Sequence, residues 1–436
     1  MKRTARVDVR TRCAGARQRG VALLAVLVVL GVAGSLVLVS VASSSAQERD
    51  RHEQSLRAMG LIRDALIARA AGDLNRPGSL PCPDYDGDGS ADGSLCTSPY
   101  IGWVPWRTLD LPDLRDAAGE RFWYALSAEF RDHSSLGPLN SETAGSLTAD
   151  GNANPRFVAV ILAPNGPLST QNRDPANTDA MAVRTQYLDG ENADGDTEYA
   201  TGMASDTFND ELLLITHEML MPVVEQRVAR QARKCLENFA VQAGAGGRFP
   251  FAAPLTDLTN FADAASTYYG RLPRTLDATN TALGTTLAWP ADDPQVPQSP
   301  GPEVTEYCLQ TGTWWDYWSE LLFYRVAPGY APDAVTPGCG TCLTVNNVGL
   351  TKTVVIVAGK AHAASPAQAR ATALNKQLAS NYLETAPSPP VSINNAFGLS
   401  TGNLGRRPRA VSYSVATGNF NDRVECLNEG GNWPCD

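Results

Sequence analysis

The hydrophobic pattern of the chain changes twice within its first 72 residues. Residues 21–46 carry no charged side chain, and the 22 residues 21–42 are mostly apolar. A helix of that length, at ~1.5 Å per residue, matches the ~30 Å hydrocarbon core of a bilayer. From residue 47 to residue 72, apolar side chains recur every three or four positions between charged ones. This second pattern predicts an amphipathic helix that continues from the apolar run.

Charge divides the chain at the same place. Residues 1–20 carry seven Lys or Arg and one Asp, a net charge of +6, which leaves 29 Lys or Arg, 45 Asp or Glu and a net charge of −16 for the rest. Because a basic segment before an apolar run stays in the cytoplasm, we expect a single-pass inner-membrane protein whose C-terminal part is periplasmic or extracellular. The acidic body argues against nucleic acid as a partner, since phosphate binding needs clustered cations.

The junction between the basic segment and the apolar run reads RQRG and then VALL, residues 17–24. It resembles the leader of type IV prepilins, which is basic, ends in Gly and precedes a long apolar helix. The resemblance implies that a prepilin peptidase cuts between Gly20 and Val21. It also implies that the apolar helix is kept as the core of a filament. The expected partners are then other pilin or pseudopilin subunits and inner-membrane assembly proteins.

The junction departs from the family pattern at two positions. Val21 stands where the family usually has Phe or Met, and Ala25 stands where it usually has Glu. The missing Glu resembles the minor pseudopilin at the tip of the type II secretion filament, and some other minor pilins. Two alternatives stay open. The apolar run is a plain anchor, or it is a secretory signal cleaved near the small residues 44–46.

Five short sequence matches recur in the same order in the later part of the chain. The pairs are GWVPWRTLD (102–110) with GRLPRTLD (270–277), FWY (122–124) with LFY (322–324), FVAVILA (157–163) with VVIVA (354–358), QYLD (186–189) with NYLE (381–384), and TFND (207–210) with NFND (419–422). A second helical pattern, residues 216–243, precedes the second set as residues 47–72 precede the first. The matches therefore indicate a duplicated domain.

The expected fold class is α+β. Each duplicated unit reads as a helix, a loop rich in Pro and Gly, and short strands, which is the order of elements in pilins. We expect a long transmembrane and amphipathic N-terminal helix and two pilin-like units of a helix on an antiparallel sheet. The expected parts are a leader (1–20), a transmembrane helix (21–46), a first unit (47–215) and a second unit (216–436).

Eight of the nine cysteines lie in the part expected to be exported, where disulfides form. Eight cysteines allow 105 connectivities. Proximity in sequence favours three pairs and leaves a fourth by elimination: Cys82–Cys96, Cys339–Cys342, Cys426–Cys435 and Cys235–Cys308. The CGTC segment 339–342 also has the spacing of a redox pair, but a strand-like sequence follows it, whereas redox thiols sit at a helix N-terminus.

The segment DYDGDGSAD, residues 84–92, has the most specific chemistry. Asp84, Asp86 and Asp88 followed by Gly89 reproduce the start of an EF-type calcium loop, and Asp92 falls at its ninth position. The twelfth position is Leu95, so the usual bidentate Glu is missing. Calcium is therefore a candidate cofactor, and related pseudopilins use calcium to fix a loop. The alternative is a solvated acidic turn, and residues 189–196 form a second, less regular acidic stretch.

No catalytic constellation emerges from the sequence: it has no Walker loop and no HExxH. We therefore expect a non-enzymatic minor pilin or pseudopilin of a type IV pilus or type II secretion filament. The alternative is a periplasmic or surface binding module on a single-pass anchor, which binds calcium or binds glycan through its tryptophans. The simplest role of the tryptophans, however, is as core aromatics beneath a sheet rich in loops.

Overall fold

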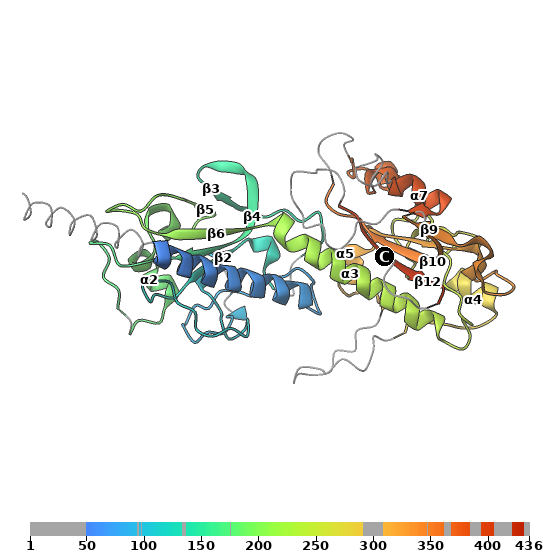
Figure 1. Ribbon diagram of the computed structural model, residues 1–436, viewed down its shortest axis with the longest axis horizontal. Coiled ribbons are helices and arrows are strands. Elements are labelled where there is room, and N and C mark those ends of the chain that lie inside the picture. The colour runs from blue at the N-terminus through green and yellow to red at the C-terminus, as the bar shows by residue number, and fades with distance from the viewer. Residues whose placement is uncertain are drawn as a thin grey trace, which may run out of the picture. The chain divides into compact units, whose positions relative to one another are not determined.

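A computed structural model (Figure 1) describes most of the chain after residue 48. The described ranges are 49–93, 96, 98–132, 137–174, 176–290, 308–346, 348–361, 368–383, 394–404 and 421–430. The expected leader (1–20), the transmembrane helix (21–46), the cleavage residues Gly20 and Val21, and Cys435 lie outside these ranges. Within them, no helix is both long enough and apolar enough to cross a membrane. By its contacts the chain divides into two units, Met1–Arg57 and Ala58–Asp436.

The structure is mixed α+β. Residues 49–72 are helical, and the later helices are α2 (Ala180–Tyr187), α3 (His217–Ala240), α4 (Asp277–Leu283), α5 (Trp315–Trp318), α6 (Ala373–Lys376) and α7 (Asn395–Thr401). Two six-stranded sheets account for the strands. We call residues 58–216 the N-terminal half and residues 217–430 the C-terminal half, because each contains one sheet.

The N-terminal half contains the first sheet. Its strands are β1 (Ile101–Trp103), β2 (Trp123–Leu126), β3 (Leu147–Ala149), β4 (Asn152–Ala163), β5 (Glu198–Tyr199) and β6 (Glu211–Thr216). The strand order is β1-β2-β4-β3-β5, and β6 pairs with β4. All pairs are antiparallel except β3 with β5. The chain passes through α2 after β4, and β5 then runs parallel to β3, so the sheet is mixed rather than purely antiparallel.

Both faces of the first sheet are buried, and alternation along the strands explains why. Tyr124 and Leu126 of β2 belong to the same hydrophobic cluster as Ile62 and Leu66 of the helix 49–72, whereas Trp123 lies in the cluster that includes α2. Successive side chains of a strand point to opposite faces. Figure 1 shows the helical residues 58–72 across one face. Their buried positions, such as Met59, Ile62 and Leu66, follow the helical spacing seen in the sequence.

The C-terminal half repeats this topology strand for strand. Its strands are β7 (Tyr269–Arg271), β8 (Leu322–Val326), β9 (Leu343–Val345), β10 (Val348–Val357), β11 (Asn403–Leu404) and β12 (Arg423–Asn428). The order is β7-β8-β10-β9-β11, β12 pairs with β10, and again the last pair, β9 with β11, is parallel. Helix α3 packs on β10 and β12 (Figure 1). It ends at Ala240, three residues before the expected end.

The register of the two sheets matches at individual residues. Gly102 lies opposite Tyr124, and Gly270 lies opposite Tyr324. A Cβ atom at Gly102 would be 2.8 Å from the carbonyl oxygen of Asp84, and one at Gly270 would be 2.0 Å from that of Ala253. Only Gly permits this close approach of a second backbone segment. The tyrosine hydroxyls also match, since Tyr124 donates to the Pro81 carbonyl and Tyr324 to the Pro250 carbonyl.

A buried arginine recurs in the two halves. The guanidinium of Arg173 stacks on Tyr187 with 5.0 Å between its central carbon and the ring centre, and that of Arg370 stacks on Tyr382 at 4.3 Å. Both donate to backbone carbonyls and to a Gln two residues earlier, Gln171 or Gln368. The carboxylate partner differs. Arg173 pairs with Glu120 at 3.1 Å, whereas Arg370 pairs with Glu142 from the N-terminal half.

A buried amide–carboxylate pair recurs as well. Asn192 donates to Asp210 at 3.0 Å, and Asn395 donates to Asp422 at 3.1 Å. Burial is the main cause that raises the pKa of Asp210 to about 7, and the hydrogen bonds from Asp189 and Asn192 only partly oppose it. The Asp pKa in an unfolded chain is about 3.9. The folded state therefore binds more protons between pH 4 and 7, so this group lowers stability as the pH rises through that window.

We predict that Asp210→Asn raises the melting temperature at pH 8 and leaves it nearly unchanged at pH 4. One oxygen of Asp210 accepts both hydrogen bonds, and the other has no partner among the described residues, so an amide can keep the contacts and lose the charge. Asp150→Asn is the matched control. Hydrogen bonds from Thr201 lower the pKa of Asp150, so this substitution should destabilise at pH 8. Thermal melts across pH check both; destabilisation of Asp210→Asn at pH 8 contradicts the prediction.

Candidate functional site

The acidic loop that follows Asp84 is attached directly to the first sheet. Asp84 and Trp103 exchange two backbone hydrogen bonds, Asp84 N–H to the Trp103 carbonyl at 3.0 Å and Trp103 N–H to the Asp84 carbonyl at 2.9 Å. This bridge extends β1 on its outer side. The absence of a Cβ at Gly102 allows the two backbones to come this close. The first acidic residue of the loop is therefore fixed by the sheet rather than by the loop itself.

Three carboxylates of the loop meet. Oxygens of Asp84, Asp86 and Asp88 all lie within 4.8 Å of one another, with Asp84 buried and the other two exposed. Asp84 accepts hydrogen bonds from the N–H groups of Gly87 at 2.7 Å and Gly89 at 2.8 Å. Gly89 has φ +89°, and a Cβ there would lie 2.6 Å from the ring of Trp106. The sequence pattern predicted both the cluster and the glycine turn.

The pKa values of Asp84 and Asp88 shift in opposite directions. Burial is the largest effect on Asp84 and raises its pKa to about 6, the two glycine N–H groups oppose this, and the nearby Asp86 and Asp88 raise it further. A hydrogen bond from the Ser90 N–H lowers the pKa of Asp88. A hard divalent cation binds oxygen ligands of this kind and would remove the repulsion between the carboxylates.

Asp92 has a different role from the one its position in the motif suggests. Its carboxylate accepts a hydrogen bond from the Tyr85 N–H at 2.6 Å, and its own N–H donates to the Pro83 carbonyl. It lies outside the group formed by Asp84, Asp86 and Asp88. Asp92 therefore closes the loop onto its first residues. The twelfth position of the motif, Leu95, lies outside the described residues.

Two further features hold the loop in place. A disulfide joins Cys82 to Cys96, one on each side of it. The segment 102–110 also makes two hydrogen bonds to the loop. The Arg107 N–H donates to the Gly89 carbonyl at 2.8 Å, and Thr108 Oγ1 accepts from the Ala91 N–H at 2.8 Å. The WVPWRTL motif thus supports the acidic loop. Trp103 is 3% exposed and so cannot present its ring to a glycan at the surface.

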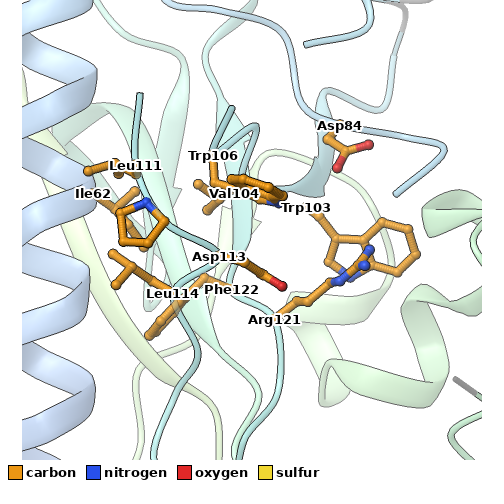
Figure 2. Close-up of a pocket in the computed structure, with 11 residues that line it drawn as sticks. Ile62, Asp84, Trp103, Val104, Trp106, Leu111, Asp113, Leu114, Arg121 and Phe122 are labelled. Atoms are coloured by element: carbon orange, nitrogen blue, oxygen red, sulfur yellow. The ribbon is translucent and has the colours of Figure 1, made fainter. Parts of the chain in front are cut away.

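A small cavity lies between the helix 49–72 and the acidic loop (Figure 2). It holds about 10 Å³, which is room for about one water molecule. Ile62 borders it from the helix, Trp106 and Leu114 border it from the loops, and Asp84 reaches its edge. Figure 2 also shows the guanidinium of Arg121 beside the ring of Trp103, 5.3 Å from the ring centre. The cavity is too small for an organic ligand.

Two further disulfides match the expected pairing. Disulfides join Cys235 to Cys308 and Cys339 to Cys342. Cys426 is also disulfide-bonded, and Cys435 lies outside the described residues. The segment after Cys342 is strand β9, as the sequence indicated, so the pair does not sit at the N-terminus of an α-helix. The first of these disulfides links α3 to the segment before α5.

The second acidic stretch is divided between two roles. Glu191, Asp194 and Asp196 are exposed, and their oxygens lie within 4.8 Å of one another. Asp189 is buried instead, and accepts from the side chain of Gln171 at 2.7 Å and from the Asn209 N–H at 2.7 Å. Only the exposed part is open to a cation.

Sequence reasoning missed the arginines of the N-terminal half. Arg121 donates to the Gly87 carbonyl within the acidic loop at 3.0 Å, and Arg173 contacts Glu120. A signal for Arg173 was present, because Gln171-Asn-Arg173 recurs as Gln368-Ala-Arg370 before the repeated Tyr-Leu pair. No comparable repeat marks Arg121, whose counterpart next to Glu320 is Leu321.

We predict that Asp84→Ala lowers the free energy of unfolding in the presence of a chelator, by about 1–3 kcal/mol. The substitution leaves the N–H groups of Gly87 and Gly89 without their acceptor, and unpaired buried donors cost that much. Asp86→Ala is the matched control and should change stability by less than about 0.5 kcal/mol, since Asp86 is exposed. Denaturant titrations of both variants check this. Equal losses would contradict the structural role of Asp84.

Comparison with known proteins gives no relative for this chain. No protein-family model matches it, and no curated protein or solved structure matches it either. Its function is therefore argued from its own residues.

Proposed function

We propose that the chain is a minor pilin-like or pseudopilin-like structural subunit, anchored in the inner membrane by its N-terminal helix before assembly into a type IV pilus or type II secretion filament. The observation that carries this proposal is the order of the parts. A basic segment ending in Gly20 precedes an apolar run, and an amphipathic helix follows that run and packs on a sheet. Pilin-like subunits, as the resemblance implies, are built in this order.

The two equivalent sheets support a duplicated head. The strand order, the parallel edge pair, the Gly–Tyr register and the stacked arginine recur in both halves. We infer that each half is a pilin-like unit of a helix on a sheet, with α3 as the second helix. A head of two such units suits a tip or low-abundance position better than a repeating shaft, because its bulk would separate neighbouring subunits.

Mechanistically, the subunit acts through surfaces rather than through chemistry. The apolar helix 21–46 packs laterally, first among lipids and then among the helices of other subunits. Prepilin peptidase and inner-membrane assembly proteins are the partners in that transfer. The alternative is a periplasmic or surface binding module on a plain anchor, and the acidic loop is the feature that favours it.

We also propose that the acidic loop binds calcium through Asp84, Asp86 and Asp88. The corresponding segment of the C-terminal half supports this reading by contrast. There Ala253 occupies the position of Asp84, and one carboxylate, Asp257, accepts from the N–H groups of Thr259, Asn260 and Ala262. Backbone N–H groups donate to carboxylates in both loops, but the first loop, unlike the second, gathers three carboxylates within 4.8 Å of one another. Calcium would fix the loop on the sheet without any catalytic step.

Cleavage by prepilin peptidase tests the filament assignment. In a strain with the peptidase, intact-mass analysis should find a mature chain that begins at Val21, and a strain without it should retain residues 1–20. Gly20→Leu should block the cut because a large side chain replaces the recognition residue, whereas Gly15→Leu in the same leader should not. A mature chain that begins at Gln47 identifies a secretory signal and overturns the proposal. An uncut chain in both strains favours the plain anchor.

Calcium titration tests the loop. We expect millimolar calcium to raise the melting temperature, since a site with few carboxylates binds with a Kd of about 10⁻⁴–10⁻³ M and ligand binding to the folded state stabilises it. Asp88→Asn should remove the shift, and Asp194→Asn in the second acidic stretch is the matched control that should keep it. Absence of a shift at millimolar calcium would falsify the calcium proposal and leave a solvated acidic turn.

A further inference from the structure

A second, larger cavity lies in the N-terminal half, on the side of the first sheet that faces α2. It holds about 190 Å³ and is lined by Trp103, Arg115, Glu120, Arg121, Thr178 and Tyr187, among others. Trp103 and Arg121 also border the small cavity of Figure 2, so the two cavities are neighbours. This one is large enough for a ligand of about the size of one sugar ring.

The side chains around this cavity include one positive charge, that of Arg121, without a carboxylate partner among the described residues. Glu120 is paired with Arg173 at 3.1 Å, and Arg115 is paired with Asp113. Arg121 has no carboxylate partner among the described residues. Its contacts there are the hydrogen bond from Nη1 to the Gly87 carbonyl and the stack on Trp103. The edge formed by Nε and Nη2 has no hydrogen bond within the described part of the chain, and that edge matches a carboxylate in a two-point contact.

The C-terminal half carries different side chains at the corresponding place. By the register of the two sheets and the sequence repeats, Arg271 occupies the position equivalent to Trp103. In the same way, Glu320 is equivalent to Glu120 and Tyr382 to Tyr187. The position of Arg121 is occupied by the apolar Leu321. Lys376 then joins the set, since its Nζ donates to Glu320 at 2.7 Å and its carbonyl accepts from Arg271 at 2.9 Å. Tyr382 also donates to Glu320. Glu320, Lys376 and Tyr382 are therefore joined by hydrogen bonds, and the counterpart of Arg121 in this half is the apolar Leu321.

We propose that this cavity binds a small organic carboxylate of the size of one sugar acid, with Arg121 as its counter-ion. The carboxylate binds the free edge of the guanidinium. The ring of Tyr187 and the hydroxyl of Thr178 contact the body of the ligand, which distinguishes it from an inorganic anion. Because the body of the chain is strongly acidic, attraction of an anion depends on this local excess of positive charge. The inference stands whether or not the chain enters a filament.

The test uses the full chain in a non-ionic detergent and titrates it calorimetrically with D-glucuronate, with D-glucose as the neutral probe. We expect saturable binding of one glucuronate and none of glucose at the same concentrations. Arg121→Gln should weaken glucuronate binding by about tenfold or more, the value of a charged hydrogen bond. Arg156→Gln is the matched control, because it removes the same charge from an exposed position in the same half and should leave binding unchanged.

A second variant guards against indirect effects of losing the contact between Arg121 and Gly87. Thr178 is exposed, so Thr178→Trp should fold normally and fill the cavity, which should abolish binding with Arg121 in place. Loss of binding in both variants supports the assignment. Equal binding of glucuronate and glucose, no binding of either, or an unchanged affinity in Thr178→Trp overturns it. Binding of acetate and sulfate as tightly as glucuronate also overturns it, because it indicates a general anion effect.

Discussion

The exchange of two backbone hydrogen bonds between Asp84 and Trp103 is the contact on which the candidate site depends. It requires Gly at position 102, because a side chain there would collide with the Asp84 carbonyl. Once this bridge forms, Asp84 is held at the sheet while Asp86 and Asp88 extend from it. The same bridge joins Ala253 and Arg271 in the C-terminal half, so the contact belongs to the architecture and the carboxylates are an addition to it.

Divergence between the two halves is concentrated around that bridge. Where the N-terminal half has Trp103, the C-terminal half has Arg271, which is fully buried between Phe323 and Tyr382. Burial lowers the pKa of Arg271 to about 10, yet stacking and the hydrogen bond to Lys376 hold it in place. A buried charge is tolerated when its surroundings are polar enough to offset desolvation. The N-terminal half therefore carries the acidic loop at this bridge, whereas the C-terminal half carries a buried arginine there.

A contact between the two halves involves an arginine and a carboxylate. The C-terminal half receives Glu142 of the N-terminal half as the partner of Arg370, so the two share an ion pair. The Arg370 side chain of this pair is buried, at 8% exposed, whereas the Glu142 side chain is 39% exposed. The N-terminal half, with its disulfide and the motif around Trp106, presents a braced loop.

Much of this was accessible in the sequence. Helical spacing located the helix 49–72 and α3, because it is a local periodicity. Short apolar runs located parts of β4 and β10, and the repeated segments indicated the duplication. The alternate spacing of Asp84, Asp86 and Asp88 predicted their meeting for the same reason. The sequence alone therefore determined the features that depend on residues close together in the chain. These include the apolar and charged character of the first 46 residues.

Tertiary structure decided the rest, because it brings together residues that no local pattern relates. The spacing of Asp92 fits a calcium ligand of the motif. In the structure its carboxylate accepts a hydrogen bond from the Tyr85 N–H, a backbone donor of the same loop. Arg121 lies 34 residues from the Gly87 carbonyl that it contacts, and only the packing of β2 beside the loop places it there. The parallel pairs β3–β5 and β9–β11 likewise depend on how the chain returns after a helix, which is a property of the whole sheet rather than of either strand.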